Sequence, residues 1–443
     1  MSAQSVDQRV IELCSALIQI DSSNYGPGGP AGEDQVAEYI EQRLRGAGYE
    51  PVTATAAPRR TNLMVRVPGA DRELPALLVH GHLDVVPVEA EQWSEQPFGG
   101  AVHDGYIWGR GASDMKYSVA AMVEVLLRWS EQGVAPRRDI VFVFLADEEA
   151  DAEFGSEWLV DTHPEWFTGV TGAIGEGGGA PVECTAADGS EVRLYPVAAA
   201  ERGIQHLRVT AHGESGHGSQ VGGENAVVKL AEGLSRLANH HWPLKPSPAG
   251  LAFLRGAAAA LGYGADLDSE AGIAAAIAAL PPGLRRSLSS SSRCSANPTV
   301  LRAGYKVNVI PGEAIAEIDV RTVPGSEREC LSTIDSLLGE GITRTFLNDQ
   351  AGIAASLDSH WMKAITATLM EADPDGHVLP SCLGGGTDAK AFARLGIDCY
   401  GFAPLGANPE GVIDSGEHGV DERVAVVSLI AGAALLEHFL TTV

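Results

Sequence analysis

The chain has 443 residues, 45% of them hydrophobic and 20% charged, which is ordinary for a folded protein long enough for two domains. Its formal net charge of −27 disfavours binding to phosphate backbones and to anionic lipid surfaces. We therefore expect neither a nucleic acid nor a membrane as a partner.

The N-terminal segment predicts an amphipathic helix, because Asp7, Arg9 and Glu12 interrupt its apolar residues at helical spacing. A signal peptide would instead have an uninterrupted apolar run after a basic region. No uninterrupted apolar run reaches the roughly 18 residues of a transmembrane helix. Six cysteines without a CxxC pair are typical of reduced thiols, so we expect a cytoplasmic protein.

Strand and helix patterns alternate over the first two hundred residues. The segment 139–146, DIVFVFLA, is a continuous apolar run, as in a strand buried on both faces. The alternation predicts an α/β domain with a largely parallel sheet and helices on both faces. Helices are predicted over 32–48, 115–129 and 153–160, and the other strands over 62–67, 74–80 and 172–174.

The pattern changes near residue 200. Segments 205–210 and 314–320 alternate polar and apolar residues, as half-exposed antiparallel strands do. Helices are predicted over 226–237 and 250–280, and SLSSSSR at 287–293 is expected to form an exposed loop. We predict an α/β domain in two parts, 1–201 and 323–443, interrupted by a smaller α+β domain at 202–322.

Candidate functional residues follow the predicted strands. In LLVHGHLDVVP (77–87), His82 and Asp84 are two residues apart and share one strand face. A zinc-binding histidine needs its second ring nitrogen oriented by a hydrogen-bond partner. A structural histidine is an equal alternative here, and His80, on the same face, is a rival ligand.

Asp114 follows the glycine-rich turn Gly109-Arg110-Gly111 and begins a predicted helix. It could be a helix N-cap, for which aspartate is favoured, or a carboxylate that bridges two cations. Because glycines allow the backbone to approach another group closely, the turn favours the second interpretation.

Three acids, Asp147, Glu148 and Glu149, follow the buried strand 139–146, at the end where α/β sheets place their ligands. Adjacent like charges are unfavourable unless cations or shared protons compensate them, although a solvated acidic loop is an alternative. Glu176 follows another strand, and His418 lies in a glycine-flanked loop where a surface histidine would be ordinary. Imidazoles and carboxylates together suit zinc, and two metals could share a bridging carboxylate. The candidate ligands are His82, Asp114, Glu149, Glu176 and His418.

A series of motifs appears in a fixed order along most of the chain: HGHLDVVP, WSEQPFGG, DGYIWGRGASDMK, DEE, GEGGG, GESGHGS, KVNVIPGE, DVRTVPG, GGTDA and the final His418. In these motifs the chain resembles the M20-type zinc metallopeptidase and aminoacylase family. That family includes glutamate carboxypeptidase, succinyl-diaminopimelate desuccinylase, aminoacylase-1 and carnosinase-type dipeptidases.

The resemblance implies two Zn²⁺ ions, with Co²⁺ or Mn²⁺ as alternatives. His82, Asp114 and Glu176 would hold one ion, and Asp114, Glu149 and His418 the other. Glu148 would be the general base, and Asp84 would orient His82. His217 would stabilise the oxyanion, often from a partner subunit, and Arg321 would bind the substrate carboxylate with help from Asn308 and the Gly386 backbone.

The resemblance also implies an enzyme that cleaves a peptide or N-acyl amide bond beside a free carboxylate in a small substrate. A carboxypeptidase or dipeptidase is the first expectation, and an N-acyl-amino-acid amidohydrolase is the alternative. The inserted domain would act as a lid and could form a homodimer.

Some residues depart from the family pattern or leave a role open. Tyr117 stands where a small residue is usual, which would narrow the site. The insertion is longer than the simplest lids of the family, which leaves dimerisation open, and some members have Asp in place of Glu176. A non-catalytic binding protein of the same fold is a rival, although every catalytic residue is present. No G-x-S-x-G motif lies in a strand–turn–helix context, which disfavours a serine hydrolase.

Overall fold

The computed structural model describes residues 6–26, 28–409 and 416–443, and its largest element is a ten-stranded sheet. The strands run in the order β1, β2, β6, β3, β7, β18, β9 and β16, and β8 and β17 also pair with β9. The central strands β6, β3, β7 and β18 are parallel to one another, whereas β2 and β9 pair with this group in the antiparallel direction. The prediction of an α/β fold with a largely parallel sheet is confirmed. The bounds are β1 Val52–Ala57, β2 Arg60–Val67, β3 Ala76–His82, β6 Ile140–Leu145, β7 Val170–Gly175, β8 Val182–Thr185, β9 Glu191–Glu201, β16 Ile353–Ala354, β17 His377–Leu383 and β18 Asp398–Gly401.

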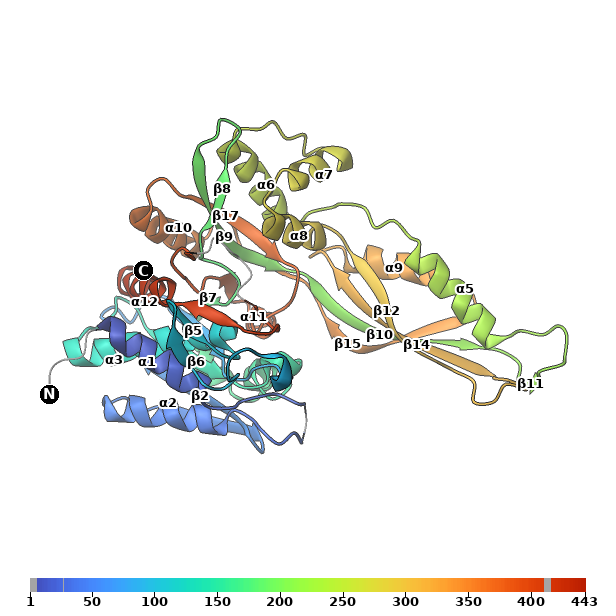
Figure 1. The fold of residues 1–443 in the computed structure, drawn as a ribbon, viewed down its shortest axis with the longest axis horizontal. Helices are drawn as coiled ribbons and strands as arrows, with labels where there is room; N and C mark the ends of the chain where they lie inside the picture. The colour runs from blue at the N-terminus through green and yellow to red at the C-terminus, as the bar shows by residue number, and fades with distance from the viewer. Residues whose placement is uncertain (1–5, 27, 410–415) are drawn as a thin grey trace.

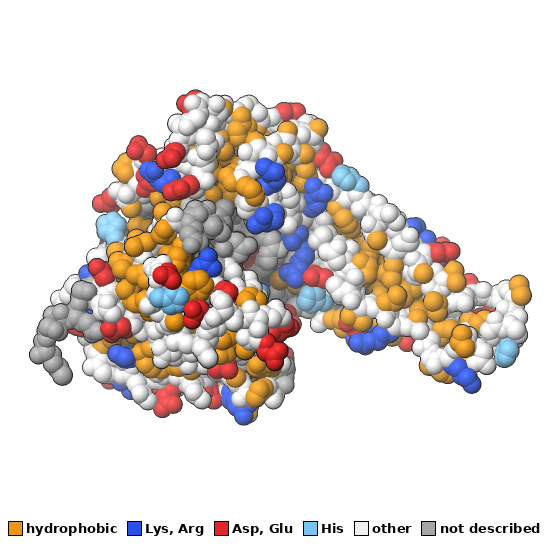
Figure 2. All heavy atoms as spheres, viewed as in Figure 1, with side chains coloured by type: hydrophobic (Ala, Val, Ile, Leu, Met, Phe, Trp, Pro, Cys, Tyr) orange, Lys and Arg blue, Asp and Glu red, His pale blue; other side chains and the backbone are white. Residues whose placement is uncertain are grey.

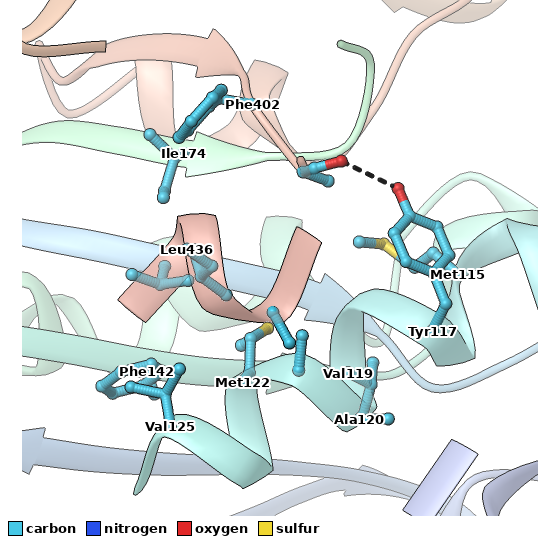
Figure 3. Close-up of a cluster of buried hydrophobic side chains, with 14 of the residues drawn as sticks. Met115, Tyr117, Val119, Ala120, Met122, Val125, Phe142, Ile174, Phe402 and Leu436 are labelled. Carbon is cyan, nitrogen blue, oxygen red and sulfur yellow. Dashed lines mark hydrogen bonds between the residues drawn. The ribbon is translucent and has the colours of Figure 1, made fainter. Parts of the chain in front are cut away.

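Helices cover both faces of this sheet (Figure 1). Every residue of β6 is buried, as its apolar run predicts for a strand covered on both sides. Figure 3 shows part of the larger core, in which Met122 of α3 lies near Leu436 of α12 and Phe142 of β6. That core contains α1 Val6–Ile18, α2 Asp34–Gly46, α3 Tyr117–Gln132, α10 His360–Ala372 and α12 Val426–Thr442, and the other face is covered by α4 Ser156–Thr162 and α11 Ala389–Ala393.

A second, four-stranded antiparallel sheet extends away from the first (Figure 1). Strand β9 continues through Arg202 into β10, so one long run of chain joins the two sheets. Apolar residues of α5 and α9 pack on one face of the second sheet. A two-stranded ribbon, β11 with β13, forms its far tip (Figure 1). The bounds are β10 Gly203–His212, β11 Gly216–His217, β12 Ser295–Ala303, β13 Val309–Ile310, β14 Glu313–Thr322, β15 Ile342–Gln350, α5 Ala226–Ala238 and α9 Glu327–Leu338.

In sequence, three more helices lie between β10 and β12 of the second sheet, but they pack against the first sheet (Figure 1). They are α6 Pro248–Leu261, α7 Glu270–Ala278 and α8 Pro282–Ser291, and they share a core with Leu194 of β9 and Leu379 of β17. The exposed loop predicted at 287–293 is wrong, because its first five residues belong to α8 and Ser291 and Ser292 are buried. Leu284 and Leu288, one helical turn apart, anchor α8 in this core.

The domain boundaries at 202 and 322 stay a prediction. Strand β15 pairs with β10 although it follows residue 322, and α6–α8 pack with the larger sheet. We therefore propose that the inserted domain extends to residue 350 and excludes residues 248–291.

Several short elements complete the fold. A three-stranded sheet of β4 Ala101–His103, β5 Tyr106–Trp108 and β19 Arg423–Ala425 joins segments from the two ends of the chain. Short helical turns lie at Ala90–Gln92, Ala112–Lys116, Glu148–Ala150 and Pro164–Phe167. Within the described residues, no helix has both the length and the apolar character needed to cross a bilayer.

Candidate metal centre

Two groups of side chains meet at the carboxyl ends of β3, β6 and β7, and they share Asp114. In the first group, Nε2 of His82 lies 2.9 Å from Oδ1 of Asp114 and 3.6 Å from Oε2 of Glu176. His82 ends β3 and Glu176 follows β7, and these strands are parallel neighbours. Parallel neighbours end at the same sheet edge, which brings residues distant in sequence together.

The second group consists of Asp114, Glu149 and His418. Nε2 of His418 lies 3.1 Å from Oδ2 of Asp114 and 3.1 Å from Oε2 of Glu149. Asp114 therefore directs one carboxylate oxygen to each histidine, the arrangement that a bridging ligand requires. The beginning of the 413–422 motif lies outside the described residues, but His418 lies within them.

The residues present fit a metal centre. Both groups offer imidazole nitrogen and carboxylate oxygen, the donors that zinc accepts. Oε1 of Glu149 is buried without a hydrogen-bond partner among the described residues, which is unfavourable unless another ligand satisfies it. Asp147 and His418 also adopt left-handed φ angles of 68° and 57°, which are uncommon for non-glycine residues.

The protonation of the metal-free cluster follows from its charges. Burial opposes the protonation of His82, but hydrogen bonds with Asp114, Asp84 and Glu176 outweigh it and raise its pKa well above the usual value. Hydrogen bonds with Asp114 and Glu149 raise the pKa of His418 to about 10. Burial raises the pKa of Glu176 to about 7. Without metal, the imidazolium ions supply the positive charge that balances the carboxylates.

The structure distinguishes the two histidines of β3. His80 is buried against Phe392, with ring centroids 4.9 Å apart, and burial lowers its pKa to about 3. It belongs to neither metal group, so it is not a rival ligand. Nδ1 of His82 lies 3.0 Å from the backbone oxygen of Asp84 and 3.5 Å from its carboxylate. The Asp84 carboxylate also accepts hydrogen bonds from the backbone N–H groups of Glu148 and Glu149, so it orders the acidic loop.

Glu422 is a supporting residue that the sequence analysis did not identify. Its buried carboxylate accepts hydrogen bonds from the backbone N–H groups of Gly111, Ser113 and Asp114, at 2.8–3.0 Å. It also accepts a hydrogen bond from Arg110, with an N–O distance of 2.7 Å. Glu422 thereby fixes the turn that presents Asp114. The only local signal is a glutamate four residues after His418.

A second supporting network, also absent from the sequence analysis, lies behind the acidic loop. The Asn24 amide donates hydrogen bonds to Asp84 and Asp147, at 2.8 and 2.9 Å. The buried Arg60 donates to Asn24 and to Glu33 and lies 3.4 Å from Asp147. The network surrounds the buried acids with donors and fixes the backbone from which Glu148 and Glu149 project.

A cavity of about 560 Å³ opens beside the metal cluster. Glu148 and the Gly386 backbone line it, as does Tyr117. Burial, followed by the charge of Glu176, raises the pKa of Glu148 well above its usual value. The Tyr117 hydroxyl donates a hydrogen bond to the backbone oxygen of Ala403 (Figure 3), so the ring is fixed in the cavity wall.

The candidate residues of the inserted domain lie apart from this cluster. His217 is exposed on β11, and its backbone neighbour Gly218 donates a hydrogen bond to Asn308. Figure 1 places β11 at the tip farthest from the large sheet. Arg321 lies on β14 near the junction of the two sheets and forms a bidentate ion pair with Asp319. One chain therefore does not bring His217 and Asn308 to the metal cluster.

Basic side chains gather at the junction of the two halves (Figure 2). Arg202 lies between β9 and β10, and burial, followed by the nearby charge of Arg321, lowers its pKa. Its guanidinium donates to the backbone oxygen of Gly384, and Lys390 donates to the backbone oxygen of Arg202. Carboxylates accompany two of these cations, because Arg321 pairs with Asp319 and Nζ of Lys390 lies 3.8 Å from Oε2 of Glu201.

Comparisons with known proteins agree with the geometry. Aminoacylase-1 of Sus scrofa is 27% identical over 90% of this chain and 90% of its own. A probable carboxypeptidase S-like 2 of Dictyostelium discoideum is 28% identical over 81% of this chain and 70% of its own. In structure, an M20 family metallo-carboxypeptidase of Sulfolobus solfataricus has a TM-score of 0.71 at 18% identity, over 99% of both chains. The sequence model of peptidase family M20/M25/M40 matches residues 78–442, so the chain belongs to this family and is a metal-dependent hydrolase of amide bonds.

Proposed function

We propose that the protein is a di-zinc hydrolase that cleaves a peptide or N-acyl amide bond beside a free carboxylate. The observation that carries the proposal is the position of Asp114, which directs one oxygen to His82 and the other to His418. His82, Asp114 and Glu176 would hold one ion, and Asp114, Glu149 and His418 would hold the other. When bound, the ions supply a water molecule of lowered pKa at neutral pH.

Glu148 acts as the general base. It lines the cavity beside the ligand cluster, and its neighbour Glu149 belongs to that cluster. Its carboxylate takes a proton from the attacking water and delivers it to the leaving nitrogen. Asp84 supports this role, because its carboxylate binds the backbone N–H of Glu148 at 3.1 Å and keeps the loop in place.

Arg321 recognises the substrate carboxylate. A guanidinium can hold a carboxylate through two parallel hydrogen bonds, and Arg321 already binds Asp319 in this way. A substrate carboxylate would take the place of Asp319 or bind Arg321 together with it. The positive charge of Arg202 and Lys390 nearby favours an anion at the junction, and the Gly386 backbone lines the adjoining cavity.

His217 and Asn308 act on the site of a partner subunit. Both lie at the tip of the inserted sheet. In a symmetric homodimer formed through that domain, the tip of each subunit would reach the active site of the other. The partner's histidine would then stabilise the oxyanion. The inserted domain would act as a lid, because the substrate lies between the two halves of the molecule.

N-acyl-amino-acid hydrolysis is the second candidate function. One observation supports this candidate. The match with porcine aminoacylase-1 covers 90% of both chains, whereas the match with the carboxypeptidase-like relative covers 70% of that relative. We also propose a cytoplasmic location, which the six free cysteines support.

The test of the catalytic assignment is Glu148→Gln. Glutamine keeps the size of the side chain but cannot accept the proton, so kcat should fall by about 10²–10⁴-fold while metal content is unchanged. Turnover of dipeptides and N-acetyl amino acids and elemental analysis measure both quantities. The control is Glu153→Gln, an exposed position four residues after Glu149, which should behave like the wild type. Full turnover by Glu148→Gln would remove Glu148 as the base. No turnover by the wild type, even with added zinc, would favour a binding protein.

A further inference from the structure

Part of the wall of the catalytic cavity is apolar, whereas the metal cluster that also lines the cavity is acidic. Phe253 of α6 and Leu284 and Leu288 of α8 line this wall, with relative exposures of 0%, 6% and 2%. Leu284 and Leu288 lie one turn apart, so they share the face of α8 that meets the cavity. We call these three residues the α8 wall.

The α8 wall belongs to the half of the molecule that holds the metal cluster. Its three residues form one hydrophobic cluster with Leu194 of β9 and Leu379 of β17. Both strands belong to the large sheet that positions the metal cluster. The wall and the metal cluster are therefore built on the same sheet, so the wall can discriminate between substrates bound at the cluster.

The direction of the substrate decides which of its groups meets the wall, and this step rests on the proposed function. In that proposal, the carboxylate side of the scissile bond points to Arg321, which lies on the inserted sheet. The acyl side must then extend along the remaining cavity, where Val182 and Pro196 face the same space as the α8 wall. A charged acyl group would lose its hydration against these apolar side chains.

We propose that the α8 wall forms a pocket for an apolar acyl chain, so that the preferred substrates are N-acyl amino acids or peptides with an extended hydrophobic acyl side. A cavity of about 560 Å³ lies within the range of pockets that enclose small organic ligands. Transfer of a methylene group from water to an apolar wall gives about a fourfold gain in binding.

The first test varies the acyl chain from acetyl to decanoyl on one amino acid, using the zinc-loaded protein. The value of kcat/KM should rise about fourfold per methylene until the chain fills the cavity. A flat dependence on chain length, or a preference for succinyl over butyryl, would overturn the proposal.

The second test uses a matched pair of tryptophan variants on α8. Ser287 is exposed and lines the cavity, so Ser287→Trp should obstruct the path of a long chain and flatten the dependence of kcat/KM on chain length. Arg286 is its exposed neighbour on the same helix but does not line the cavity, so Arg286→Trp should keep the wild-type slope. Equal slopes in the two variants would contradict the assignment of the wall.

A binding measurement separates failure of this inference from failure of the proposed function. Straight-chain carboxylates from acetate to decanoate are titrated calorimetrically into wild-type protein and into Ser287→Trp. Affinity that rises with length in the wild type alone supports the α8 wall even when no amide is cleaved. Affinity that does not change with length overturns the α8 wall, whatever the protein hydrolyses.

Discussion

At the scale of single residues, Glu422 shows how strongly the metal centre depends on groups that do not contact the ion. Its carboxylate accepts hydrogen bonds from the backbone N–H groups of the turn that ends at Asp114. Loss of the charge in Glu422→Gln would leave Arg110 buried without its carboxylate and loosen the bridging ligand. Groups that orient metal ligands contribute about 10–100-fold to metal affinity, and we expect a loss of that size.

Zinc titration against a competing chelator measures this affinity. Glu131→Gln is the control, because that exposed glutamate of α3 forms an ion pair with Arg9 and lies outside the Glu422 network. Unchanged zinc affinity in Glu422→Gln would show that the turn holds Asp114 without help from the carboxylate.

The sequence predicted the candidate ligands but not the residues that hold them. His82, Asp114 and Glu149 stand in motifs whose residue types already suggest metal chemistry, and the structure brings them together. Glu422, Asn24 and Arg60 act on partners distant in sequence, such as Arg110, which is 312 positions from Glu422. A single sequence does not distinguish a buried glutamate that supports a turn from a glutamate on the surface.

At the scale of elements, the metal centre depends on three parallel strands that end at one edge of the sheet. The apolar runs of β3, β6 and β7 made these strands predictable. The order of the strands in the sheet could not be predicted in this way. The error at 287–293 has a local cause, because a run of serines resembles a loop unless the leucines four residues apart are weighed against it.

Zinc should stabilise these strand ends selectively. In the metal-free protein the loops after β3, β6 and β7 hold several carboxylates close together, and cations would remove their repulsion. We expect zinc to slow amide hydrogen exchange at 112–116, 147–149 and 176–179, and to leave strands β12 and β14 unchanged. Hydrogen-exchange mass spectrometry with and without zinc measures this. Equal slowing in the two sheets would indicate global stabilisation instead of binding at the strand ends.

At the scale of the whole molecule, the inserted domain separates residues that the proposed mechanism needs together. His217 belongs to β11, which forms the tip of the second sheet and lies far from the large sheet (Figure 1). The change of pattern near residue 200 predicted an insertion, and β10 does begin a separate sheet. The later boundary was harder to predict, because β15 returns to that sheet after the helix α9.

Subunit complementation tests the proposed dimer. His217→Ala and Glu148→Gln should each be nearly inactive, but mixing them produces heterodimers in which one site has Glu148 and receives an intact histidine from its partner. After unfolding and co-refolding in equal amounts, about a quarter of wild-type activity should return if subunits pair at random. The control is a mixture of His217→Ala and wild-type protein in which each protein is refolded alone before mixing. No recovery, although the mixed dimers form, would place His217 outside the partner's active site.

The most direct test of the central claim is a zinc titration of chelator-treated protein near pH 7, with turnover and proton release followed together. The account predicts that turnover is complete at about two zinc ions per chain. It also predicts that protons are released, because the pKa of His418 is raised to about 10 in the metal-free protein and zinc requires the neutral imidazole. Affinity should therefore fall as the pH is lowered. Full turnover with no bound metal, or zinc uptake that releases no protons, would contradict the account.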